Sequence, residues 1–216
     1  MDNEARALYR RARSDKYWNN RIFWTVILIV IAGLLSAAKP VVLPDGGAVT
    51  YFSLLFLWLL TFFFGPKYGF VTGALFGFVK LGVTIVTGEY VNYEVGAIIL
   101  EYPLACGAFA LGGLVLRKAK DNEVIPRDVR GLRLGYIIGV LAMGVCYIIS
   151  AFLFYPPMQP DVLATVIDTI VYDMSYLLIE AAITMLLLLI PQVLDVIFYL
   201  KHVATNDRSD PTLKSF

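Results

Sequence analysis

The sequence is poor in the residues that most enzymes use to bind metals or to attack a substrate. It contains one histidine, His202, and two cysteines, Cys106 and Cys146. Their positions form neither a metal-ligand spacing nor a nucleophile–base pair. Both cysteines fall inside long apolar blocks, where a free cysteine usually behaves as a small apolar residue. We therefore expect no catalytic site, metal or cofactor, and the composition argues against an enzyme.

The lack of an ATP-binding motif and of a large net charge excludes two further classes of function. No phosphate-binding loop of the form GxxxxGK[ST] occurs, so this chain cannot supply ATP hydrolysis itself. The 18 Lys and Arg residues nearly balance the 17 Asp and Glu residues, which leaves a net charge of +1 and argues against a nucleic-acid partner. The position of the charges is therefore more informative than their sum.

What the chain has in excess is apolar residues, at 59% of the sequence against roughly 45–50% in soluble domains. These residues form long blocks, and a bilayer core of about 30 Å needs roughly 20 apolar residues per helix. The pattern predicts an all-α membrane protein with six transmembrane helices. We expect them near residues 22–38, 51–64, 68–87, 96–116 and 134–154, with a sixth that begins between residues 161 and 171 and reaches 190.

The basic residues predict the orientation of these helices. Six lie within residues 6–21, Lys67 lies between the second and third helices, six lie within residues 117–133, and three follow the last helix. In the other connections Lys39 is the only basic residue. Because Lys and Arg accumulate in cytoplasmic loops, both termini are expected in the cytoplasm.

The same pattern divides the chain into three parts. Residues 1–21 form a basic cytoplasmic segment, which is either an interfacial helix or a solvated tail. Residues 22–190 are expected to form a six-helix membrane domain, and residues 191–216 an interfacial or cytoplasmic tail. In the first outer loop, Gly46-Gly47 predicts a flexible turn that could act as a lid.

Four ionisable residues lie inside the predicted helices: Lys80, Glu101, Asp173 and Glu180. Such groups are costly in a membrane and mark either a functional site or a paired interior. Glu101 shares a helical face with Ala105, Ala108 and Gly112, so it is expected to point into the bundle. We interpret the four residues as a pocket open to the outside. The alternative is that Lys80 pairs with a carboxylate and only holds the helices in register.

Several motifs resemble the S components of energy-coupling factor (ECF) transporters, with the thiamine-binding branch as the closest match. They are Gly46-Gly47, the run from Gly65-Pro66-Lys67-Tyr68-Gly69 to Gly73 and Gly77, Glu101-Tyr102-Pro103-Leu104-Ala105, and the stretch from Ile170 to Glu180. In that family the last stretch resembles a tyrosine–asparagine pair followed by Ser-Tyr-Leu-Leu-Pro-Glu. Here Asp173 replaces the asparagine and Ile179 replaces the proline.

The resemblance implies a substrate-capturing membrane subunit that works with a transmembrane scaffold subunit and two cytoplasmic ATPase subunits. It implies that Glu101 pairs with the aminopyrimidine of thiamine and that the adjacent tyrosine lines the pocket. The residues expected at the substrate site are Lys80, Glu101, Tyr102, Asp168, Tyr172 and Asp173. The small residues of the first helix are expected to contact the scaffold: Ala32, Gly33, Ser36 and Ala37.

The sequence therefore predicts the S component of a vitamin uptake transporter in a bacterial plasma membrane, with thiamine or a thiamine precursor as the ligand. Three alternatives stay open at this point. The chain could be an S component for another vitamin-like ligand, a stand-alone transporter or channel, or a structural or assembly protein of the membrane. No internal repeat is visible in the sequence, and such a repeat would favour a secondary transporter.

Overall fold

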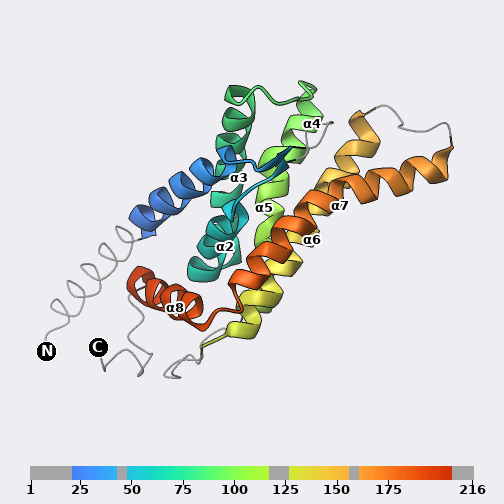
Figure 1. The fold of residues 1–216 in the computed structure, drawn as a ribbon. Helices are drawn as coiled ribbons and strands as arrows, with labels where there is room; N and C mark the ends of the chain where they lie inside the picture. Colours follow the sequence, from blue (N-terminus) through green and yellow to red (C-terminus); the bar gives the residue numbers. More distant parts are fainter. Residues whose placement is uncertain (1–20, 43–47, 117–126, 156–160, 206–216) are drawn as a thin grey trace, which may run out of the picture.

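A computed structural model describes residues 21–42, 48–116, 127–155 and 161–205. The predictions for the basic segment before residue 21, for Gly46-Gly47 and for residues 206–216 lie outside these described residues. Within them the chain is almost entirely helical, as expected for the predicted fold class (Figure 1). The one addition is a small antiparallel hairpin, in which β1 (Val41–Val42) pairs with β2 (Ala48–Val49).

The helices follow the predicted order. The first helix covers Arg21–Ala37, and after the hairpin come α2 (Ser53–Phe64) and α3 (Pro66–Val86). A continuous helical run from Val95 to Val115 contains α4 (Val95–Ile99), the π turn η1 (Leu100–Leu104), α5 (Ala105–Ala108) and the 3₁₀ segment η2 (Phe109–Val115). The chain then forms α6 (Val129–Phe154), α7 (Val162–Leu187) and α8 (Pro191–Thr205).

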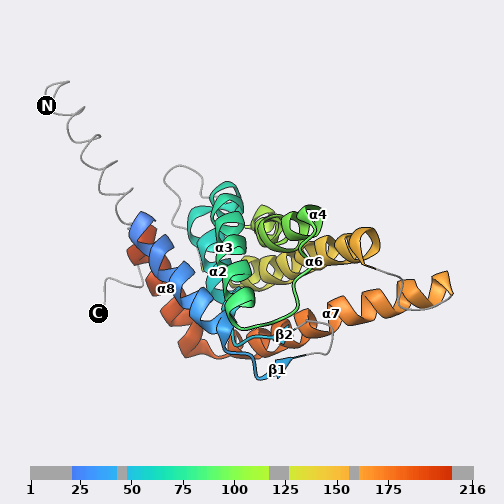
Figure 2. The same cartoon turned by 90° about the horizontal axis from the view of Figure 1, so that it is seen from above.

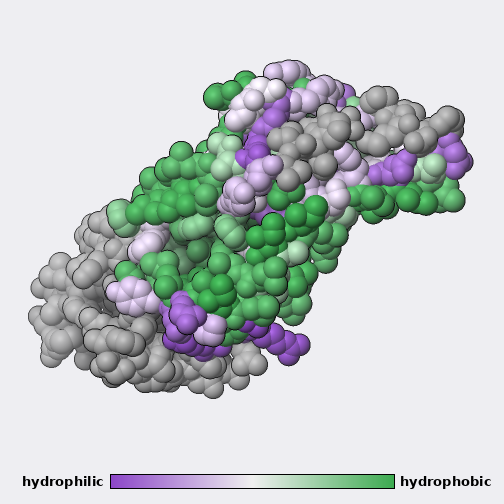
Figure 3. Space-filling model, in the orientation of Figure 1, coloured by the Kyte–Doolittle hydropathy of each residue, from purple (hydrophilic) through white to green (hydrophobic). Residues whose placement is uncertain are grey.

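Four of the described helices are long and apolar enough to cross a membrane: α3, the run Val95–Val115, α6 and α7. The first helix and α2 are apolar but shorter. In Figure 3 the apolar surface covers the middle of the bundle, and hydrophilic residues gather toward its ends. The protein is therefore a multi-pass helical membrane protein.

Small residues bring the central helices into backbone contact. A Cβ atom at Gly73 of α3 would lie 2.3 Å from the carbonyl oxygen of Cys106, and one at Gly77 would lie 2.4 Å from the Tyr102 carbonyl. A Cβ atom at Gly112 of η2 would lie 1.8 Å from the carbonyl oxygen of Gly135 on α6. Only glycine fits at these crossings, so the Val95–Val115 run is held tightly between α3 and α6.

The short helix α2 lies in the middle of the protein rather than at its surface. Ten of its residues are buried, and its Trp58 is fully buried and donates its indole N–H to the carbonyl oxygen of Leu132 at 3.0 Å. Phe62 packs edge-on against Phe198 of α8, with ring centroids 5.7 Å apart. Helix α2 therefore joins α6 and α8, and α8 packs across the end of the bundle (Figure 1).

Helix α7 is positioned differently from the others. Its first turns extend beyond the neighbouring helices in both views (Figures 1 and 2). Further along, α7 packs against α6 and against β2 of the hairpin. Residues of α3, η1, α6 and α7 together line a cavity, and the polar residues of the predicted helices meet there.

Candidate functional site

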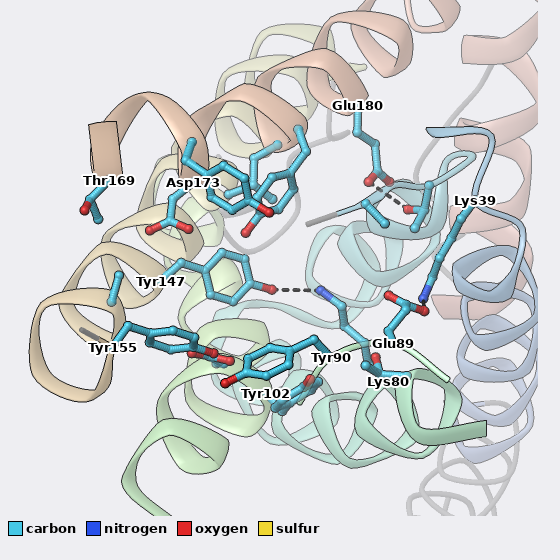
Figure 4. A pocket seen from close by; sticks show the side chains of 18 of the residues that line it. Lys39, Lys80, Glu89, Tyr90, Tyr102, Tyr147, Tyr155, Thr169, Asp173 and Glu180 are labelled. Atoms are coloured by element: carbon cyan, nitrogen blue, oxygen red, sulfur yellow. Dashed lines mark hydrogen bonds and ion pairs between the residues drawn. The ribbon is translucent and has the colours of Figure 1, made fainter. Parts of the chain in front are cut away.

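A cavity of about 250 Å³ lies among α3, η1, α6 and α7 (Figure 4). Residues after β2 and at the start of α2 complete its lining, together with Lys39 and the Glu89-Tyr90 pair of the α3–α4 loop. Its described lining contains six tyrosines, four carboxylates and two lysines. A cavity with this many aromatic rings and charged groups is suited to a flat, charged ligand.

The π turn η1 brings two neighbouring residues to the cavity wall. Pro103 lacks the backbone N–H that an α-helix uses at this position, and the helix widens into a π turn around it. Glu101 and Tyr102, which precede the proline, both line the cavity. The motif that the sequence singled out therefore owes its geometry to the proline that follows it.

Glu101 is held by residues of α6. The hydroxyl of Ser150, which is fully buried, donates a hydrogen bond to Oε1 of Glu101 at 2.8 Å. The phenol of Tyr155, just after the end of α6, lies near the same carboxylate. Burial, together with the charge of Glu101, raises the pKa of Tyr155, so this phenol keeps its proton at neutral pH. Glu101 therefore presents an oriented carboxylate to the cavity.

Lys80 extends from α3 into the cavity. Its ammonium donates a hydrogen bond to the hydroxyl of Tyr147 on α6 at 2.8 Å and lies 5.3 Å from the centre of that ring. Among the described residues it forms no ion pair with a carboxylate. The helix-locking pair between Lys80 and a carboxylate, considered as an alternative, is thus not what the structure shows.

The two buried carboxylates of α7, Glu180 and Asp173, have opposite environments. Oε2 of Glu180 accepts a hydrogen bond from the Thr50 hydroxyl at 2.7 Å, and Oε1 accepts one from the backbone N–H of Leu54 at 3.2 Å. Glu180 thereby caps the start of α2, where the helix dipole favours a negative charge. Oδ2 of Asp173 is buried and has no hydrogen-bond partner among the described residues. Asp173 therefore remains available to a ligand.

The rim of the cavity is tied by contacts between loops. Lys39, after the first helix, forms an ion pair with Glu89 of the α3–α4 loop, and the Thr87 hydroxyl donates to the same carboxylate. In the same loop Tyr90 packs against Tyr155, with ring centroids 6.4 Å apart. The segments on either side of the cavity mouth are thus linked through side chains.

Comparison with known proteins identifies the family. Residues 22–198 match the family described as thiamine transporter protein (Thia_YuaJ). The chain belongs to this family. The thiamine transporter ThiT of Bacillus subtilis (strain 168) is 25% identical over 155 residues, which cover 70% of this chain and 76% of that protein. No solved structure matches the chain.

Membership of the thiamine transporter family confirms the resemblance that the motifs indicated. It makes the chain a transport protein rather than an enzyme. Together with the long apolar helices, it supports the predicted location as a multi-pass protein of the cell membrane.

Five of the six residues predicted for the substrate site line this cavity: Lys80, Glu101, Tyr102, Tyr172 and Asp173. The sixth, Asp168, is exposed on α7 and is not among the residues that line the cavity. The neighbouring Thr169 points inward instead. Helical spacing explains the difference, because Asp173 shares the inward face with Thr169 and not with Asp168.

The sequence reasoning missed the contribution of α6. Tyr147, Ser150 and Ala151 follow the spacing i, i+3, i+4, which places them on one helical face. Tyr147 and Ala151 line the cavity, and Ser150 holds Glu101. That spacing is a usable signal, but none of the three residues is charged, so none stands out in an apolar helix.

The residues predicted for the scaffold contact lie on the first helix. Ala32 and Ser36 are buried in this chain, at 0% and 1% exposure. A Cβ atom at Gly33 would lie 3.2 Å from the side chain of Val79 on α3. Ala37 is exposed. The scaffold contact itself stays a prediction.

Proposed function

We propose that this chain is the substrate-binding S component of an ECF-type transporter and that it binds thiamine in the cavity. The observation that carries the proposal is the buried, unpartnered Oδ2 of Asp173 in a cavity that also holds Glu101. A buried carboxylate without a counter-charge is costly, and a cationic ligand would remove that cost. Thiamine carries a permanent positive charge on its thiazolium ring.

The rest of the lining supports a cationic heteroaromatic ligand. Four carboxylates against two lysines give the described cavity a net negative character when all are ionised. The six tyrosine rings offer faces that attract cations and stack on flat rings. In this proposal Glu101 binds the aminopyrimidine, because its two oxygens can accept from an amine and a protonated ring nitrogen, and Asp173 neutralises the thiazolium.

The proposed topology has six spans with both ends in the cytoplasm. The first helix and α2 would complete the four longer spans, with α2 enclosed by protein on most sides. The even count agrees with the basic residues at both ends of the chain and in alternate connections. In this orientation the cavity faces the outside of the cell.

The proposed partners are a transmembrane scaffold subunit and two cytoplasmic ATPase subunits, since the chain has no ATP-binding loop of its own. Of the predicted contact residues Ala32, Gly33, Ser36 and Ala37, the first three are buried within this chain, so Ala37 is the one that can meet the scaffold directly. Replacing Ala37, the exposed member, with leucine should abolish uptake while leaving ligand binding intact, because a bulky side chain keeps helices apart. Loss of both activities would mean that Ala37 supports the bundle itself.

A binding screen tests the proposed ligand. The purified protein is heated with thiamine, hydroxymethylpyrimidine, riboflavin or biotin, since a tight ligand raises the melting temperature by mass action. Calorimetric titration then compares the wild type with Glu101→Gln. The control is Glu94→Gln, because Glu94 is exposed at the start of α4 and does not line the cavity.

We expect submicromolar binding of thiamine that is lost in Glu101→Gln and retained in Glu94→Gln. Absence of thiamine and pyrimidine binding in the wild type would refute the proposal. Equal affinity in the wild type and Glu101→Gln would remove Glu101 from the site.

A further inference from the structure

The two lysines of the cavity differ in how their charges are balanced. Lys39 is paired with Glu89. Lys80 has only the neutral hydroxyl of Tyr147 as its hydrogen-bond partner among the described residues. An ammonium group has three N–H donors, so two donors of Lys80 remain for a ligand or water. Among the described residues, Lys80 is thus a cation with no carboxylate in ion-pair contact, although Glu101 and Glu180 lie near enough to interact with it electrostatically.

A cation at this place is unexpected for a site that would hold only a cationic ligand. Its repulsion of a thiazolium would weaken binding, and a methionine could fill similar space without this cost. The cost disappears if the ligand itself carries a negative charge that reaches Lys80. The same ammonium then becomes a source of affinity.

The geometry separates a basic from an acidic part of the cavity. Lys80 extends from α3 toward Tyr147, from the side of the cavity where Lys39 and Glu89 lie, and Asp173 extends from α7 on the other side of Tyr147 (Figure 4). The unpartnered Oδ2 of Asp173 suits a positive group, and the ammonium of Lys80 suits a negative one. A ligand with separated opposite charges would satisfy both.

We infer that Lys80 binds an anionic group of the ligand and that the preferred ligand is a phosphate ester of the thiamine type. This inference rests on the function proposed above. A phosphate on the hydroxyethyl arm of the thiazolium ring provides a negative charge at a fixed distance from the positive one. Asp173 then faces the thiazolium, and Lys80 faces the phosphate.

Titrations of thiamine and thiamine monophosphate into four proteins test the inference. The proteins are the wild type, Lys80→Met, Lys80→Arg and the control Lys67→Met. Lys67 lies on the same helix as Lys80 but is exposed at its other end and does not line the cavity. A further arm titrates thiamine in the presence of inorganic phosphate, because a free anion could also occupy the position beside Lys80.

In the wild type and in Lys67→Met the phosphate ester should bind about tenfold more tightly than thiamine, since it gains a charge-assisted contact. Lys80→Met should reverse this preference, because the phosphate then loses the one lining lysine that is not ion-paired among the described residues and still faces the carboxylates, while thiamine binds as well as before or better. Lys80→Arg should keep the preference. Retained thiamine binding in Lys80→Met also reports that this variant is folded.

Two results would overturn the inference while leaving the proposed function intact. In the first, the wild type binds thiamine tightly and the ester more weakly, and the ratio of the two affinities is the same in Lys80→Met. In the second, inorganic phosphate raises the affinity for thiamine as much as the ester bond does, and this increase requires Lys80. If neither thiamine nor its ester binds to the wild type, the proposed function fails as well. If Lys80→Met abolishes binding of both ligands, the affinities of Lys80→Arg are decisive. The inference is overturned if Lys80→Arg binds thiamine more tightly than the ester.

Discussion

The same three helical segments build two very different regions. At one end, Gly73 of α3, Gly112 of η2 and Gly139 of α6 bring backbones together so closely that no larger side chain fits. Further along, the small residues give way to Lys80 on α3 and to Tyr147 on α6, and the helices enclose the cavity. We call these regions the packed end and the cavity end. In each of these segments, one stretch packs tightly against its neighbours, and another stretch contributes side chains that line the cavity.

Helix α7 repeats this contrast between two carboxylate side chains, Glu180 and Asp173. Glu180 has a partner for each oxygen and holds the start of α2, so its charge supports the fold. Asp173, on the same face and two turns away, has a buried oxygen without a partner. Buried polar groups in native proteins are nearly always satisfied, and an exception calls for a functional explanation. One carboxylate is therefore structural, and the other is assigned to the ligand.

The largest effect is expected from breaking the packed end. Gly112→Leu should lower the free energy of unfolding by about 3 kcal/mol or more, because even its Cβ would overlap the carbonyl of Gly135. The matched change is Gly82→Leu on α3, where nothing lies within 4 Å of a Cβ atom. Thermal unfolding in detergent should show a large drop for Gly112→Leu only. Equal melting temperatures would mean that the close crossing does not stabilise the bundle.

A smaller difference in stability is expected between variants of the two buried carboxylates of α7 in the ligand-free protein. Glu180→Gln weakens two hydrogen bonds to a buried charge and should cost about 1–3 kcal/mol of stability. Asp173→Asn removes a buried charge that has an unpartnered oxygen, so stability should stay the same or rise. Thermal unfolding of both variants without ligand measures this difference. The structural and ligand-binding assignments would have to be exchanged if Asp173→Asn were the more destabilised protein.

The smallest effect is expected at the cavity end, in the affinity for thiamine. Ser150→Ala removes the hydrogen bond that orients Glu101, which is worth about 1 kcal/mol, or about a fivefold loss of thiamine affinity. Ser175→Ala is the control, because the Ser175 hydroxyl donates only to the carbonyl of Tyr172 on its own helix. Calorimetry should detect weaker binding in the first variant alone. Unchanged affinity in Ser150→Ala would show that Glu101 does not depend on this bond for its orientation.

Much of this fold could be predicted from hydropathy and charge. The expected boundaries agree with the observed helices to within a few residues for α3 and for the Val95–Val115 run. Helix α6 begins five residues earlier than expected, at Val129 instead of residue 134, and includes the polar turn that holds Arg130 and Arg133. A capping hydrogen bond from the Gly131 N–H to Asp128 explains the early start, since it satisfies the first turn outside the apolar block.

The cavity could be predicted only in part. Charged groups in apolar helices identified Lys80, Glu101 and Asp173 because their cost in a membrane is visible in the sequence. The partner of Lys80 was not predictable, because Tyr147 is 67 residues away and periodicity does not say which helix faces which. The separate roles of Glu180 and Asp173 likewise depend on the position of Thr50 after the hairpin, which no local pattern encodes.

The most direct test of the central claim is a structure determined with thiamine bound at saturating concentration. We expect the aminopyrimidine within hydrogen-bonding distance of the Glu101 carboxylate and the thiazolium beside Asp173, among the tyrosines of the cavity end. Thiamine bound elsewhere on the protein, or bound in the cavity with both carboxylates out of reach, would contradict it.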